Sequence, residues 1–372
     1  MRFSDIKGLE NVKKKLINAV SNDHVAHAQL FLGKAGSPNL PLALAFANYL
    51  NCESPSATDS CGVCAACYKM DRYIHPDIHF VYPVSGTKDI KGKDVISTSF
   101  LKEWRTFLTA NPSGNLDAWS GHYGGEDKQG NISKEESRQI IKSLSLKSFE
   151  GKYKVMVIWL PEYMNVSAAN GILKILEEPP EQTIFLLVSN DSEKLLTTIL
   201  SRTQIVTIPK YSDASIEQML IENQGIEAAQ ANQLAHLADG DYNLALKLLN
   251  NIEDDSHQLF TDWMRDCFRK DFSQLVLKSD QFHGMNKVAQ RSLFQYALNM
   301  FREALIYTAA PDLKRVSGVV STFIDNFSKV MDSEKVERIN KLINDAHYHL
   351  ERNASPKIIF LDLSLQIARI IK

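Results

Sequence analysis

Long hydrophobic runs are absent from this 372-residue sequence, and so is a strong excess of charge of either sign. No stretch approaches the roughly 18 apolar residues that a membrane-spanning helix needs, and the N-terminus has no signal-peptide apolar core. Lysine and arginine number 42 against 44 acidic residues, so the balance does not demand a polyanionic partner. We therefore expect a soluble, cytoplasmic protein without a membrane partner, in which any contact with nucleic acid is local.

Cysteine is also scarce, and four of the five cysteines lie close together in the sequence. Cys52, Cys61, Cys64 and Cys67 form a C-x8-C-x2-C-x2-C cluster, whereas Cys267 stands alone. Four clustered thiols with C-x2-C spacing in a cytoplasmic chain favour tetrahedral zinc coordination. A disulfide pair and an iron–sulfur cluster are the alternatives, and reducing conditions argue against the disulfide.

A closed set of four thiolate ligands leaves no open position for a substrate, so we expect the zinc ion to be structural. His75 is a spare candidate ligand, but we assign it to the loop and strand that follow the cluster. Cys267 shares an apolar helical pattern with Phe260, Trp263 and Met264. We therefore expect Cys267 to be a core residue rather than a reactive thiol.

The stretch 167–208 has a clear secondary-structure pattern. Apolar residues recur at helical spacing over 167–178, and Pro179-Pro180 ends that helix because proline has no N–H group. The apolar run Thr183–Ser189 favours a strand that is buried on both faces of a parallel sheet. A second strand is expected at 204–208.

Arg202 lies between these two strands. It is either a solvated loop residue, the ordinary interpretation for an isolated arginine, or an arginine finger whose charged fork reaches a phosphate on another subunit. The run Leu-Glu-Glu-Pro-Pro at 176–180, the run Phe-Leu-Leu-Val-Ser-Asn-Asp at 185–191 and Ser201-Arg202 resemble the bacterial DNA polymerase III clamp-loader ATPases. This resemblance implies that Arg202 is an arginine finger acting in trans.

The run from His27 to Gly33 resembles a first core strand, and a phosphate-binding loop is expected directly after it. The usual pattern is G-x-x-x-x-G-K-[ST], in which N–H groups and the lysine cradle phosphates and the hydroxyl binds magnesium. Gly33 and Gly36 are present, but Pro38 stands at the second glycine, Asn39 replaces the lysine and Leu40 cannot bind magnesium. We therefore expect this degenerate loop to bind neither ATP nor magnesium.

The other ATPase positions have changed in the same way. Trp159 and Leu160 stand where a strand should end in a magnesium-binding aspartate and a water-activating glutamate. Asn243 stands where the resemblance places the arginine of a second sensor. Lys34 or Glu162 could substitute only after a register shift, in a motif where about an ångström matters. The resemblance therefore implies a relative that kept the fold but not ATP hydrolysis.

The resemblance also implies the architecture. We expect an α/β domain of the AAA+ type, a P-loop NTPase fold with a parallel sheet, at 1–210, with a zinc module inserted at about 50–75. A small helical lid is expected at 211–252 and an all-α C-terminal collar domain for oligomerisation at 253–372. Gly, Ser, Asn, Asp and Lys dominate an insertion at about 85–131, which is either a surface elaboration or a contact with a neighbouring subunit or DNA.

Three helix starts can be placed from local signals. Ser133 with Glu136 fits a capping box, in which two side chains satisfy backbone N–H groups reciprocally. Ser333 is expected to cap a later helix. Ser355-Pro356 opens the final helix, because proline is favoured at the first helical position.

The resemblance implies a non-hydrolysing clamp-loader subunit that helps to load the sliding clamp onto primed DNA and completes a neighbour's ATP site. Its partners would be the other clamp-loader subunits, delta and gamma/tau, with the clamp and DNA in the complex. The alternatives are an ATP-hydrolysing subunit of the gamma/tau kind or a related AAA+ motor, which need a lysine at 39 and an acid at 159 or 160. A zinc-dependent DNA-binding protein is a third reading, but no basic recognition helix follows the cysteines.

Overall fold

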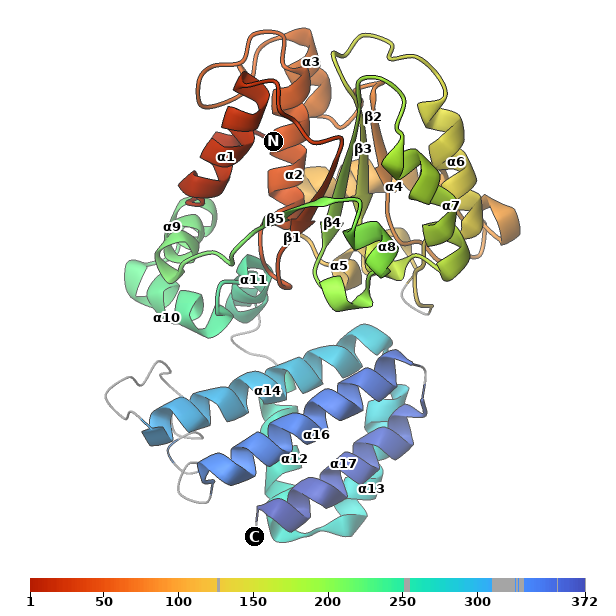
Figure 1. Ribbon diagram of the computed structural model, residues 1–372. Coiled ribbons are helices and arrows are strands. Elements are labelled where there is room, and N and C mark those ends of the chain that lie inside the picture. The colour runs from red at the N-terminus through yellow and green to blue at the C-terminus, as the bar shows by residue number, and fades with distance from the viewer. Residues whose placement is uncertain are drawn as a thin grey trace. The chain divides into compact units, whose positions relative to one another are not determined.

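The computed structural model describes residues 1–125, 128–250, 255–309, 325, 327, 331–352 and 354–371. The chain divides into two compact units. Met1–Ile226 and Ala238–Leu244 form the first unit, and Glu227–Leu237 and Ala245–Lys372 form the second. The first unit holds a sheet covered by helices, and the second is helical (Figure 1).

The first unit is built on a parallel sheet, as predicted. Its five strands stand in the order β2-β3-β4-β1-β5. The strands are β1 (Ala28–Leu32), β2 (Ile78–Val81), β3 (Lys154–Trp159), β4 (Thr183–Ser189) and β5 (Gln204–Thr207). Leu30 pairs with Leu187 on one side and with Ile205 on the other. Both β3 and β4 are buried along their whole length, as parallel strands covered on two faces should be.

Helices cover both faces of the sheet. Alternate strand residues point to opposite sides, and in β3 and β4 the residues on both sides are buried. On one face, α6 (Lys134–Leu144) and α7 (Val166–Glu177) pack together, and Ile140 and Ile172 join Met156 and Phe185 in a buried cluster. On the other face lies α2 (Asn39–Asn51), which contacts β1, β3 and β4 and is buried throughout (Figure 1). The other helical elements of this unit, apart from the insertion and the lid region, are η1 (Phe3–Asp5), α1 (Glu10–Ser21), α3 (Ala65–Met70), η4 (Pro161–Tyr163), η5 (Ser192–Lys194) and α8 (Thr197–Leu200).

The predicted insertion is folded against the sheet. Its two ends are held together by an antiparallel bridge between Val84 and Asn131. Between them lie η2 (Gly92–Asp94), η3 (Ser97–Phe100), α4 (Leu101–Ala110) and α5 (Leu116–Tyr123). Residues 126 and 127 of the insertion lie outside the described part of the chain.

The three predicted helix starts have different outcomes. Ser133 is the N-cap residue of α6, but its side chain makes no capping hydrogen bond. The capping-box prediction is wrong because Glu136 instead accepts the backbone N–H of Ser97, at 2.7 Å, from the insertion. The cap of α16 (Ser333–Glu351) is Asp332 rather than Ser333. The last helix, α17 (Pro356–Ile370), starts at its proline as predicted.

Three helices follow the sheet where the lid is expected: α9 (Asp213–Gln224), α10 (Ala228–Ala238) and α11 (Tyr242–Asn250). The division into two units passes through them, since α9 and residues 238–244 belong to the first unit. The expected lid limit at 210/211 stays a prediction, and the limit at 252/253 lies outside the described residues.

The second unit is all helical in its described part. It contains α12 (Asp255–Arg269), α13 (Phe272–Gly284), α14 (Lys287–Ala309), α16 and α17. Among the residues that the structure describes, no helix is both long enough and apolar enough to cross a membrane.

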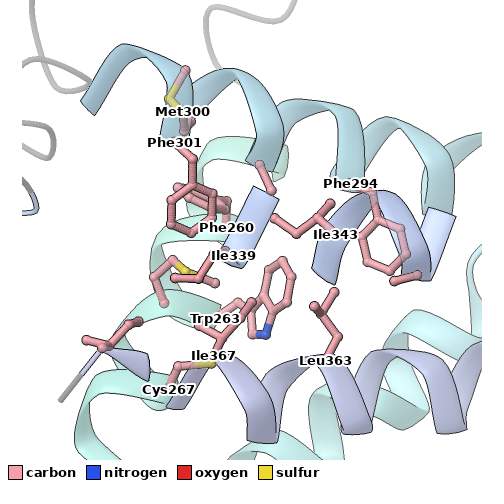
Figure 2. Close-up of a cluster of buried hydrophobic side chains, with 14 of the residues drawn as sticks. Phe260, Trp263, Cys267, Phe294, Met300, Phe301, Ile339, Ile343, Leu363 and Ile367 are labelled. Carbon is pink, nitrogen blue, oxygen red and sulfur yellow. The ribbon is translucent and has the colours of Figure 1, made fainter. Parts of the chain in front are cut away.

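A single apolar core holds these helices together. Trp263 of α12 lies within it, near Ile343 of α16 (Figure 2). The rings of Trp263 and Phe360 are 4.7 Å apart, and the indole N–H of Trp263 donates to Ser364 Oγ at 2.8 Å. Cys267 is fully buried in the same core, as expected, and burial raises the pKa of its thiol.

Candidate functional site

The four clustered cysteines meet in space. Cys52 follows α2, Cys61 and Cys64 lie in the next loop, and Cys67 belongs to α3. All four sulfur atoms lie within 4.8 Å of one another. The Sγ atom of Cys67 is 3.7 Å from that of Cys52 and 3.9 Å from that of Cys61. These sulfurs are not joined in a disulfide, which needs a separation of about 2.05 Å.

This donor set fits a tetrahedral metal ion. Bonds of about 2.3 Å from a tetrahedral metal place neighbouring sulfurs roughly 3.8 Å apart, which agrees with the separations from Cys67 to Cys52 and to Cys61. Backbone N–H groups point at the sulfurs, from Cys61 to Cys52 at 3.2 Å and from Cys64 to Cys61 at 3.4 Å. The N–H groups of Val63 and Cys64 lower the pKa of Cys61 to about 6, whereas burial raises the pKa of Cys52. The cluster can therefore hold one metal ion.

His75 is not part of the sulfur cluster. Its ring is buried, and its Nε2 lies 3.7 Å from a carboxylate oxygen of Glu150. Nearby, the Asp77 carboxylate accepts three consecutive backbone N–H groups, from residues 149–151, at 2.6 to 2.8 Å. These contacts join the loop before β3 to the start of β2. We therefore assign His75 a structural role at this edge of the sheet, next to the same loop.

The loop between β1 and α2 lies where the phosphate-binding loop was expected, and Asp241 packs against its Gly36. Gly36 has a φ of +87°, and a Cβ placed there would lie 2.4 Å from the Cβ of Asp241. Asp241 is held in position, because its Oδ1 accepts the N–H groups of Asn243 and Leu244 at 2.9 and 3.2 Å. A carboxylate against the loop repels a phosphate group.

The residue at the lysine position is engaged in hydrogen bonds inside the sheet. Asn39 is 5% exposed, and its Nδ2 donates to the carbonyl of Ser189 at 3.1 Å and to Asn190 Oδ1 at 3.0 Å. Pro38, the N-cap residue of α2, has no N–H group to offer. Lys34 is exposed at the other end of the loop. Position 39 therefore offers no positive charge to a phosphate group.

At the end of β3, an aromatic cluster lies where ATP hydrolysis would need an aspartate and a glutamate. Trp159 is 3% exposed, and its ring lies 5.1 Å from Trp104 and 6.4 Å from Phe107, both in α4. Trp104 stacks on Tyr82 at 4.0 Å and meets Trp119 of α5 edge-on at 5.0 Å. The insertion thus packs directly over the end of the strand where a magnesium ligand would be needed.

Glu162 does not take the place of the missing acids. Its Oε1 accepts the backbone N–H of Asn190 at 2.9 Å, and its Oε2 is buried without a partner among the described residues. Burial raises the pKa of Glu162 to about 7. Leu160 is also buried, with a left-handed φ of +54°.

The residue at the second-sensor position contacts the insertion. Asn111 Nδ2 donates to Asn243 Oδ1 at 3.0 Å, and Asn243 Nδ2 donates to the carbonyl of Ser113. Asn111 and Ser113 follow α4, and sequence reasoning missed both because no local pattern links them to residues some 130 positions away.

Arg202 lies two residues after the end of α8 and stays partly exposed. Its Nε and Nη2 donate to Glu177 Oε2 at 2.9 and 2.7 Å, and its Nη1 donates to the carbonyl of Thr198 at 3.1 Å. The side chains are 30% exposed for Arg202 and 58% for Glu177. An ion pair in contact with solvent contributes only ~0.2–1 kcal/mol, so a better partner can displace Glu177.

Comparison with known proteins identifies the family. The family model described as DNA polymerase III, delta subunit, matches residues 8–212. The DNA polymerase III subunit tau of Bacillus subtilis (strain 168) is 26% identical over 388 residues, which cover 96% of this chain and 60% of the relative. Subunit delta' of the same organism is 28% identical over 228 residues, which cover 61% of this chain and 55% of the relative. The chain therefore spans 55 to 60% of the length of these relatives.

Among solved structures, a gamma subunit-related protein of DNA polymerase III from Thermotoga maritima MSB8 is 15% identical, with a TM-score of 0.37. The match covers 98% of this chain and 100% of that chain. Because the family match extends over more than half of the sequence, the chain belongs to the DNA polymerase III clamp-loader family.

Proposed function

We propose that this chain is a clamp-loader subunit of the delta-prime type, which does not hydrolyse ATP and which supplies Arg202 to the ATP site of a neighbouring subunit. The observation that carries the proposal is a contrast between two sites. Asp241 packs against Gly36 in the chain's own phosphate loop, whereas Arg202 remains 30% exposed beside an easily displaced partner. A protein that has lost its own nucleotide site and kept the arginine can use it only on a nucleotide bound elsewhere.

Three substitutions support the absence of hydrolysis. Asn39 removes the charge that holds the phosphates, Pro38 removes an N–H group from the loop, and Trp159 removes a magnesium ligand. Asn39 is hydrogen-bonded to Ser189 and Asn190, and Trp159 packs against Trp104. ATP and magnesium are therefore not expected in this site.

The proposed partners are the subunits delta and gamma/tau, with the sliding clamp and primed DNA engaged through the complex during clamp loading in the cytoplasm. The second unit supports a role in subunit assembly, because large apolar residues of α12 and α13 are exposed. Phe268 is 58% exposed, Phe272 53% and Leu277 55%. Such residues on a helical unit are typical of surfaces that meet other proteins.

We further propose that the cysteine cluster binds one structural zinc ion through Cys52, Cys61, Cys64 and Cys67. The sulfur separations suit zinc–thiolate bonds, and four thiolates complete a tetrahedron. Such a closed site contributes to folding and takes no direct part in chemistry.

An ATP-hydrolysing subunit of the gamma/tau kind is the second candidate. It is favoured by one observation, that the tau relative aligns with 96% of this chain whereas the delta' relative aligns with 61%. The purified chain distinguishes the two: the delta-prime reading expects no ATP turnover, and turnover that survives Lys34→Ala would favour the gamma/tau reading.

The function is tested in a complex reconstituted with delta, gamma/tau, the clamp and primed DNA. Arg202→Ala should lower DNA-stimulated ATP hydrolysis and clamp loading, while folding, zinc content and assembly stay unchanged. An arginine finger in trans contributes ~10³–10⁵ in turnover in GTPases, and a complex with several sites will show a smaller loss. Arg138→Ala, which removes an exposed arginine paired within α6, is the control. Clamp loading at the wild-type rate by Arg202→Ala would show that Arg202 is an ordinary surface residue and not an arginine finger.

A further inference from the structure

The part of the insertion that faces the former nucleotide site is the segment 97–119, which comprises η3, α4 and the first residues of α5. We call this segment the brace. One end of the brace contacts the sheet. The other contacts residues 238–244, called the turn below, which run from the end of α10 into the first residues of α11 and include Asp241 and Asn243. Both contact regions belong to the first compact unit.

The sheet end of the brace is closely packed. Tyr82, just after β2, donates from its hydroxyl to the carbonyl of Ser97 at 2.6 Å and from its backbone N–H to Ser97 Oγ at 3.0 Å. Trp104 lies between Tyr82 and Trp159, with ring centroids 4.0 and 5.1 Å away. Trp104 is fully buried, so the brace is fixed to two strands of the sheet.

The other end of the brace holds the turn. Asn243 Oδ1 accepts from the Asn111 side chain, and Asn243 Nδ2 donates to the Ser113 carbonyl. The chain reversal that presents these groups is tight, because a Cβ on Gly114 would lie 2.3 Å from the ring of Phe107. The groups facing the turn therefore have little freedom to move.

The turn also contacts the phosphate loop. Asp241 packs on Gly36, and Lys210 Nζ donates to the carbonyl of Asp239 at 2.9 Å and to its carboxylate at 3.1 Å. The pieces form a continuous chain of contacts, from the end of β3 through the brace to the turn and back to the loop after β1. In domains that close on a ligand, that ligand supplies the bridging contacts.

We propose that the brace replaces a bound nucleotide: it holds the turn 238–244 against the sheet and keeps the first unit closed without ATP or ADP. This role goes beyond the proposed function and does not depend on it, because it concerns the conformation of the chain alone. It assigns an internal contact to the buried side of the segment 97–119.

Hydrogen–deuterium exchange of the full chain tests the proposal at residues 238–244. Asn243→Ala removes both contacts with the brace and should speed exchange there roughly tenfold, the change expected when one or two partly buried hydrogen bonds are lost. Asn111→Ala, which leaves the Ser113 contact in place, should speed exchange by a smaller factor. Asn344→Ala is the control, because that side chain donates to the carbonyl of Asn340 within its own helix, α16.

Addition of millimolar ATP or ADP with magnesium provides the second readout. The wild-type exchange at 238–244 should not change, because the closure does not depend on nucleotide. Wild-type exchange that slows on adding nucleotide would overturn the proposal, and so would an unchanged rate in both Asn243→Ala and Asn111→Ala. If Asn243→Ala does not fold, Asn111→Ala decides by itself.

Discussion

Arg202 donates from Nε and Nη2 to the same carboxylate oxygen of Glu177, at 2.9 and 2.7 Å. Glu177 is the last residue of α7, and Arg202 follows the short helix α8, so the pair joins the ends of two helices. The guanidinium is thereby held in one place while part of it stays open to solvent. A phosphate oxygen from a neighbouring subunit would compete with Glu177 for the same N–H groups.

Removing the charge of Glu177 should help Arg202 to engage phosphate. We expect Glu177→Gln to raise the apparent affinity of the reconstituted complex for ATP by about 1.5- to 5-fold, the range that corresponds to an exposed ion pair of 0.2–1 kcal/mol. Steady-state ATP hydrolysis at varied ATP concentration measures this. Glu178→Gln changes the adjacent exposed glutamate and is the control. A lower affinity in Glu177→Gln alone would mean that Glu177 orients the arginine.

Replacement of Arg202 by lysine should be nearly as damaging as replacement by alanine. Lysine keeps the positive charge but cannot present the planar fork that engages two phosphate oxygens. DNA-stimulated ATP hydrolysis and clamp loading by the reconstituted complex measure the loss. Near-normal rates with Arg202→Lys would show that only a charge is needed at this position.

Metal analysis should find one zinc per chain. Cys67→Ser should abolish zinc binding and expose residues 52–70 to proteolysis, because a structural site contributes its binding free energy to folding. Treatment of the wild-type protein with a chelator should have the same effect. Cys267→Ala removes the cysteine of the helical core and should leave the zinc content unchanged. Iron in the site, or no metal after preparation with zinc, would contradict the assignment.

Glu162 should make the protein less stable as the pH rises. Burial raises its pKa to about 7, from 4.5, so the unfolded chain loses this proton first as the pH rises above about 4.5. The native state therefore loses stability between about pH 4.5 and 7, by ~3 kcal/mol at most, and the loss is constant above that range.

Glu162→Gln cannot ionise and keeps an oxygen for the Asn190 N–H group. Urea denaturation at pH 4.5 and pH 8 should therefore show a smaller loss of stability in Glu162→Gln than in the wild type. Glu178→Gln, at an exposed site, should behave like the wild type. An identical pH dependence in all three proteins would mean that Glu162 titrates normally.

Restoring an acid at the end of β3 should not restore ATP hydrolysis. Trp159→Asp removes a ring that packs against Trp104 and Phe107 and places a carboxylate among aromatic side chains. We expect a loss of at least ~3 kcal/mol in the free energy of unfolding, and no ATP turnover even when combined with Asn39→Lys. Trp159→Phe should be much milder. Urea denaturation and an ATPase assay measure the two effects, and turnover by the double variant would contradict the closed site.

Local chemistry made several features predictable from the sequence. The C-x2-C spacings bring Cys61, Cys64 and Cys67 together whatever the rest of the chain does, because each pair is separated by two residues. The apolar run of β4 and the proline at the start of α17 likewise act through their immediate neighbours. The replacements at Pro38 and Asn39 were informative because a missing N–H group and a missing charge do not depend on tertiary context.

Only the tertiary structure decided which distant groups meet. Glu136 was expected to cap its own helix, but the insertion supplies the N–H group of Ser97 and captures its carboxylate. The contact of Trp104 with Trp159 and that of Asn111 with Asn243 join residues far apart in the chain. Their pairing follows from the packing of α4 over the end of the sheet. By itself the sequence therefore determined the main helices and strands, the cysteine cluster and the loss of the phosphate-binding residues. Tertiary packing decided which side chains occupy the region where a nucleotide would bind.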